Sequence, residues 1–96
     1  LIVACGAVTR AARAAAQRAE GRRVGVLQLQ TIWPFPEQAL LEAARTAERI
    51  LVPEMNYAGQ LAGEVYKLFG PEKPVIRVNR YNGSVITPAD ILRALD

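Results

Sequence analysis

Histidine is absent from this chain of 96 residues, and cysteine occurs once, at Cys5. The absence of histidine removes the commonest general base, and with it the Ser-His-Asp triad, the Cys-His dyad and most zinc sites. A single cysteine forms no internal disulfide and cannot by itself ligate an iron–sulfur cluster. These forms of chemistry are therefore excluded from the chain itself, and the cysteine usage favours a reducing, cytoplasmic compartment.

Long hydrophobic runs and clustered charge are also missing. No apolar run approaches the roughly 18 residues of a membrane span, and the apolar residues 1–5 have no basic region before them. The net charge is +3, but the ten arginines and two lysines are scattered instead of forming a stripe with interleaved aromatics. We therefore expect neither a membrane nor a nucleic acid as partner. The length of 96 residues predicts a single domain, 1–96. Because the chain lacks an initiator methionine, we interpret it as a fragment of a longer subunit.

What the sequence does contain is a fourfold alternation of short apolar runs with helical patterns. Continuous apolar strands that alternate with helices are typical of a parallel sheet with helices on both faces. We expect buried strand residues such as Leu51 and Ile76. The predicted strands span 1–5, 24–29, 50–52 and 75–78, and the predicted helices span 7–20, from 36 onward, from about 57 to 69, and 87–95.

The helices carry recognisable stripes and start signals. The inner face of the first helix is almost entirely alanine, which would let its axis lie close to the sheet. Leu40, Leu41 and Ala44 form the expected inner stripe of the second helix. Asn56 is a candidate cap for the third helix. At the last helix, Thr87 can act as the cap while Asp90 reaches back to it.

Parallel sheets place their binding loops beyond the carboxyl ends of the strands, here after Gly6, Gln30, Pro53 and Asn79. The first loop matches neither a G-x-G-x-x-G motif nor a P-loop. Gly6 is best explained by a tight strand-to-helix turn, and the alternative is an anion held by the amides of the helix start.

The remaining loops are rich in aromatic and polar side chains. Residues 33–36 form a stiff apolar segment that either packs on its own sheet or contacts another domain. Glu54 either caps a helix or makes a polar contact across a boundary, and no second acid is placed with it for catalysis. We therefore assign no catalytic, cofactor-binding or metal-binding residue and predict a docking surface at these loops. It comprises Trp33, Phe35, Asn56, Tyr57, Gln60, Tyr81 and Asn82.

Four segments together resemble a known family. They are Val-Ala-Cys-Gly at 3–6 before an alanine-rich helix, Leu-Gln-Thr-Ile-Trp-Pro-Phe-Pro at 29–36, Val-Pro-Glu-Met-Asn-Tyr-Ala-Gly-Gln-Leu at 52–61, and 81–83 leading into 87–92. In this order they resemble the transketolase C-terminal-like domain of 2-oxoacid:acceptor oxidoreductase α subunits, with 2-oxoglutarate:ferredoxin oxidoreductase most similar. The resemblance covers the whole chain.

The resemblance implies a three-layer α/β/α sandwich whose four parallel strands lie in the order 2-1-3-4. It also implies a fifth, antiparallel edge strand before residue 1, which this sequence lacks. For the whole complex it implies thiamine diphosphate, magnesium and iron–sulfur clusters, oxidative decarboxylation of a 2-oxoacid to its acyl-CoA, and electron transfer to ferredoxin. The domain itself would be a structural and assembly element, inactive when isolated, that contacts the other domains of its subunit and the β subunit.

Two other assignments remain open at this point. One is the C-terminal domain of a transketolase or of a 2-oxoacid dehydrogenase E1 β-type subunit, which share the domain type. The other is a flavodoxin-like module that binds a small molecule, because a fold does not determine a function. Such a module would bind a nucleotide or thiamine diphosphate on its own, whereas an assembly domain would not.

Overall fold

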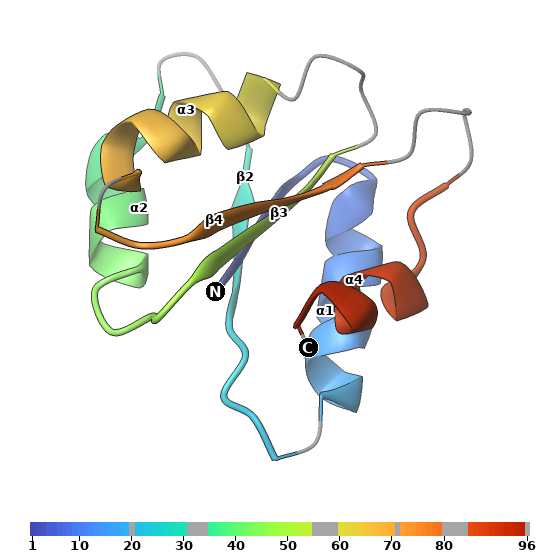
Figure 1. Ribbon diagram of the computed structural model, residues 1–96. Coiled ribbons are helices and arrows are strands. Elements are labelled where there is room, and N and C mark those ends of the chain that lie inside the picture. The colour runs from blue at the N-terminus through green and yellow to red at the C-terminus, as the bar shows by residue number, and fades with distance from the viewer. Residues whose placement is uncertain (20, 31–34, 55–59, 71, 80–84, 96) are drawn as a thin grey trace.

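Strands and helices alternate along the described part of the chain, as Figure 1 shows for the computed structural model. The structure describes residues 1–19, 21–30, 35–54, 60–70, 72–79 and 85–95. In chain order the elements are β1 (Ile2–Cys5), α1 (Val8–Arg18), β2 (Val26–Leu29), α2 (Glu37–Ala43), β3 (Ile50–Glu54), α3 (Gln60–Phe69), β4 (Val75–Asn79) and α4 (Pro88–Leu95).

The strands form one parallel sheet in the order β2-β1-β3-β4, which confirms the expected order 2-1-3-4. β1 pairs with β2 from Ile2↔Val26 to Cys5↔Leu29, and β1 pairs with β3 at Ile2↔Leu51. The helices α1 and α4 cover one face of the sheet, and α2 and α3 cover the other (Figure 1). The expected three-layer sandwich is therefore confirmed.

One core lies between the sheet and the pair α2 and α3. Alternate strand residues point into it, among them Val3 of β1 and both Ile50 and Val52 of β3, and each of the three is fully buried. Leucine and valine side chains of the two helices cover them. Each large aliphatic side chain removed from water in this way contributes about 1.5–3 kcal/mol of transfer free energy.

The second core lies between the sheet and the pair α1 and α4. Ile2 and Ala4 of β1 and Leu51 of β3 point into it, opposite to their neighbours in the strands. Ala12 and Ala15 of α1 have no exposed surface, so the alanine face of this helix packs on the sheet as the sequence predicts. Burial on both faces explains why the strand sequences are continuously apolar.

The strand β3 continues through Pro53 to Glu54, two residues beyond the predicted end at Val52. Leu51 donates its N–H to the carbonyl oxygen of Leu1 at 2.8 Å, so that N–H points toward β1. The backbone groups of successive strand residues face opposite neighbouring strands, so residues two apart face the same one. The nitrogen of Pro53 therefore faces β1, as that of Leu51 does. The ladder to β4 is preserved at Pro53↔Val78, so a proline can occupy this interior strand.

Two residues that were predicted to lie in the core, Leu41 and Ile76, are more exposed than expected. Leu41 was placed in the inner stripe of the second helix, but it is 41% exposed, while Leu40 beside it is fully buried. The helix α2 has seven residues and presents Leu40 to the sheet, which leaves Leu41 about 100° away. Ile76 is only partly buried, because β4 is an edge strand.

None of the described helices is long and apolar enough to cross a membrane.

Candidate functional site

The carboxyl ends of the strands carry the loops in which the docking surface was predicted. Five of its seven residues, Trp33, Asn56, Tyr57, Tyr81 and Asn82, lie outside the described residues. Gln60 is the first residue of α3. Phe35 is partly buried and packs against the core beneath α2 and α3. The structure therefore anchors Phe35 on its own domain, and a shared surface of all seven residues stays a prediction.

Glu54 ends β3 and caps the following helix from across the loop. Its side chain is 5% exposed. The N–H of Leu61 donates to Oε1 at 2.7 Å, and the N–H of Ala62 donates to Oε2 at 3.1 Å. Both amides belong to the first turn of α3, where backbone N–H groups have no partner within the helix. Of the two interpretations of Glu54, the structure supports the helix cap. The predicted cap, Asn56, lies outside the described residues.

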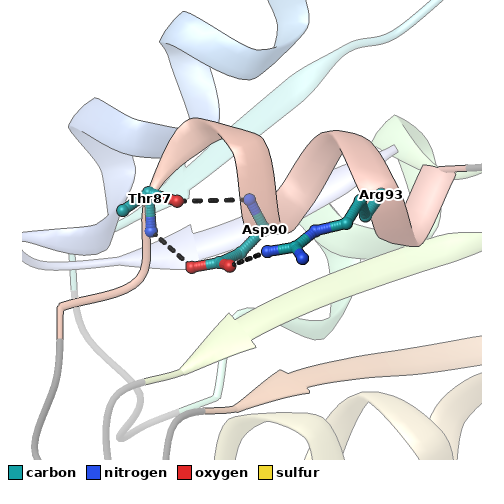
Figure 2. Close-up of polar contacts among 3 residues, drawn as sticks. All are labelled: Thr87, Asp90 and Arg93. Carbon is teal, nitrogen blue, oxygen red and sulfur yellow. Dashed lines mark hydrogen bonds and ion pairs between the residues drawn. The ribbon is translucent and has the colours of Figure 1, made fainter.

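The last helix begins with the reciprocal cap that the sequence predicts, drawn in Figure 2. The N–H of Asp90 donates to Oγ1 of Thr87 at 3.2 Å, and the N–H of Thr87 donates to Oδ2 of Asp90 at 2.9 Å. Arg93 pairs with the other oxygen of the same carboxylate at 2.5 Å. This carboxylate is thus engaged in starting α4.

The start of α1 differs, because no side chain there accepts a bond from the backbone. Gly6 has φ = 71°, a conformation that glycine adopts without strain, and its carbonyl oxygen accepts the N–H of Thr9 at 3.1 Å. Ala7 occupies the cap position without a side-chain bond, and the first turn contains no acid. The tight turn predicted at Gly6 is confirmed.

A pocket of about 460 Å³ opens beside this helix start. Its described lining consists of Gly6, Ala7, Thr9, Arg10, Arg13 and Gln28. Nη2 of Arg13 donates to Oε1 of Gln28 at 2.8 Å, which joins α1 to β2 across the pocket. Sequence reasoning noted the glycine turn but missed the pocket, because Gln28 is 15 residues away from Arg13 and meets it only in the folded chain.

Arginines also gather at the opposite edge of the sheet, around a pocket of about 470 Å³. Arg22 and Arg49 both donate to the carbonyl oxygen of Leu95 at the end of α4. Cationic side chains at this position stabilise the negative end of a helix. Arg49 is remote in the sequence from the adjacent pair Arg22 and Arg23, so the sequence alone did not predict that these charges gather.

The chain matches the family model described as pyruvate:ferredoxin oxidoreductase core domain II over residues 1–91. It is 33% identical over 96 residues to 2-oxoglutarate synthase subunit KorA of Methanothermobacter marburgensis, an alignment that covers 98% of this chain and 25% of the relative. It is 35% identical over 97 residues to ketoisovalerate oxidoreductase subunit VorB of Methanothermobacter thermautotrophicus, covering 99% of this chain and 27% of the relative. The chain thus spans about a quarter of the length of these curated relatives.

Among solved structures, the chain resembles 2-oxoglutarate:ferredoxin oxidoreductase from Magnetococcus marinus, determined with 2-oxoglutarate, coenzyme A and succinyl-CoA bound. The TM-score is 0.84 with 27% sequence identity, and the match covers 98% of this chain and 16% of that chain. The similarity therefore extends over the whole sandwich and not only over one strand–helix unit.

Proposed function

Because the chain belongs to the family of pyruvate:ferredoxin oxidoreductase core domain II, we propose that it is a non-catalytic assembly domain of a 2-oxoacid:ferredoxin oxidoreductase α subunit. The full complex would oxidatively decarboxylate a 2-oxoacid to its acyl-CoA and pass electrons to ferredoxin. The observation that carries this proposal is the match of the complete four-strand sandwich to a domain within a much larger oxidoreductase chain.

The two carboxylates Glu54 and Asp90 are bonded to groups of the domain itself, which supports a non-catalytic role. Glu54 is buried, and both of its oxygens are occupied by amides of α3. Asp90 is engaged with Thr87 and Arg93 at the start of α4. A general acid or base must instead reach a substrate proton directly or through one water. These two carboxylates hold the fold together and are not available for that task.

The cofactors of the complex do not fit the residues of this chain. A diphosphate cofactor of this kind is held through a divalent ion, and among the described residues no three acidic, histidine or cysteine side chains lie together so that they could hold a metal ion. An iron–sulfur cluster needs several thiolates, and the sequence contains one cysteine. We therefore assign thiamine diphosphate, magnesium and the clusters to other domains and other subunits, and no step of the reaction to this chain.

The docking surface is proposed at the carboxyl ends of the strands. Phe35 and Gln60 follow β2 and β3 there, and the other five predicted residues follow β2, β3 and β4 in the sequence. Aromatic side chains are enriched in the energetically important centres of interfaces, and a stiff proline-flanked segment loses little entropy when it is ordered. The partners would be the other domains of the α subunit and the β subunit.

The test replaces Trp33 by alanine in the full-length subunit and, separately, in the 96-residue chain. We expect the subunit variant to assemble more weakly, measured by sedimentation at a series of concentrations, while the melting temperature of the chain changes little. Tyr66→Ala is the matched control, because Tyr66 is an aromatic residue of α3 that is 60% exposed. Equal assembly of the Trp33 and Tyr66 variants would contradict the proposed surface.

A further inference from the structure

We propose that a groove between α1 and the start of α4 receives an acidic, amphipathic helix from another part of the oxidoreductase complex. This inference rests on the assembly role proposed above and adds a second contact surface to it. The helices α1 and α4 lie side by side on one face of the sheet (Figure 1). None of the seven residues of the docking surface is among the described residues that line this α1–α4 groove.

The first observation is that the α1–α4 groove is open and almost entirely apolar. It has a volume of about 420 Å³. Its described lining comes from the beginning of α1 and from residues 85–88, and every side chain in it except those of Arg10 and Thr87 is apolar. A groove of this kind is the usual seat for the apolar face of a partner helix.

The second observation is the position of Val85 on the rim of the groove. Val85 is 66% exposed, more than the other exposed large hydrophobic residues of the described chain. The adjacent Ile86 is 1% exposed and lies in the core beneath α1 and α4, which fixes the segment in place. A single exposed valine needs no explanation. Val85 differs because it continues the apolar lining of a groove.

The third observation is the shape of the opposite wall. Ala7, at the cap position, is followed by Ala11 and Ala14 at intervals of four and three residues, so the three lie along one side of the helix. Their small side chains allow the axis of another helix to come close. Larger apolar side chains on that helix, at the spacing i, i+3, i+4 and i+7, would then fill the groove.

The fourth observation is the charge beside the groove, which specifies the polar part of the partner. The helix α1 carries Arg10, Arg13 and Arg18 and no acidic residue. Arg10 lines the groove, and Arg18 lies four residues after Ala14, on the same side of the helix. None of the three arginines forms an ion pair with a described residue; Arg13 bonds to the uncharged Gln28. Because interfaces join surfaces of opposite charge, the partner helix carries aspartate or glutamate beside its apolar residues.

The test places the photoreactive residue p-benzoylphenylalanine at position 85 of the full-length subunit, and the purified complex is irradiated. We expect a cross-link to another domain or subunit, at a segment in which Asp or Glu flanks apolar residues at helical spacing, identified by mass spectrometry. A cross-link confined to residues 80–84 of the same chain, to a second copy of this domain or to a segment without acids would overturn the inference, and so would the absence of a cross-link. Each of these results in an assembled complex leaves the assembly role itself intact.

Two variants of the full-length subunit test the named side chains. Val85→Asp and Arg10→Glu should each weaken assembly about tenfold or more at low salt, because each brings a negative charge against an acidic partner. The matched controls are Leu41→Asp and Arg45→Glu, which make the same changes at exposed positions on the opposite face of the sheet.

The melting temperature of the subunit should be maintained in both variants. Val85 and Arg10 are exposed, and a glutamate in the first turn of a helix is favourable. Assembly of the unaltered subunit should weaken as salt is added, and that of Arg10→Glu should respond less, since one attractive charge is gone. The inference is refuted if Val85→Asp and Arg10→Glu assemble as well as their controls.

Discussion

Replacement of Glu54 by glutamine is the sharpest test of how this fold is held together. Glu54 is 5% exposed, and each of its carboxylate oxygens accepts one amide of α3, at 2.7 and 3.1 Å. Glutamine has nearly the same shape but a single acceptor oxygen, so its NH₂ group must face one of the two N–H groups. One amide of Leu61 or Ala62 then loses its partner in a buried place.

The expected loss can be estimated from these contacts. An unsatisfied buried donor costs about 1–3 kcal/mol. Loss of the negative charge at the helix start adds about 0.3–1 kcal/mol, and up to about 2 kcal/mol where the site is partly buried. We therefore expect Glu54→Gln to lower the free energy of unfolding by about 2–4 kcal/mol. In a domain of this size each 1 kcal/mol shifts the melting temperature by about 4–8 °C, so the decrease should reach at least about 8 °C.

Chemical denaturation of the 96-residue chain measures the loss, and amide hydrogen exchange locates it. Exchange should accelerate first at Leu61 and Ala62. Glu42→Gln is the control, because its carboxylate is 74% exposed and lies 3.9 Å from Arg45 in an exposed pair, whose removal should change stability by less than about 0.5 kcal/mol. The reasoning fails if the two variants lose the same small amount, or if exchange at the two amides is unaffected.

Three further predictions concern the core, the last helix and the cofactor. Leu51→Ala should cost about 2–5 kcal/mol in chemical denaturation, because Leu51 is fully buried in an interior strand, whereas Ile76→Ala on the edge strand should cost less; equal losses would contradict the burial. Thr87→Ala should cost about 0.5–2 kcal/mol through loss of the cap, and Thr46→Ala at an exposed site should be neutral. Calorimetry should detect no binding of thiamine diphosphate to the 96-residue chain, and micromolar affinity would disprove the assembly-domain assignment.

The alternation of elements and the capping of α4 could be read from the sequence because both depend on neighbouring residues. Short, mostly apolar runs identify the strands, and the spacing of Thr87 and Asp90 is that of a local reciprocal cap. The strand order came from the family resemblance, and the sheet confirms it. The exposure of Leu41 was not predicted from the sequence. A helix of seven residues presents too narrow a face to the sheet to bury two adjacent leucines.

The role of Glu54 could be stated from sequence only as one of two alternatives. A carboxylate seven residues before the amide it binds is outside the reach of local capping rules, and the loop between them must first bring β3 and α3 together. The same holds for the pocket at α1, where Arg13 meets Gln28 only because β1 and β2 are paired in parallel. In both cases tertiary packing determined which polar groups became neighbours.

The sequence by itself therefore determined the strands, the helices, the tight turn at Gly6 and the absence of histidine and cysteine chemistry, because each of these is a property of short segments or of composition. Tertiary structure alone decided that Glu54 stabilises α3, that Arg22 and Arg49 converge on the end of α4, and that Thr9 lies in the wall of a basic pocket. These arrangements depend on distances between residues that are remote in the chain, and only the packing of helices on a sheet of defined strand order sets such distances.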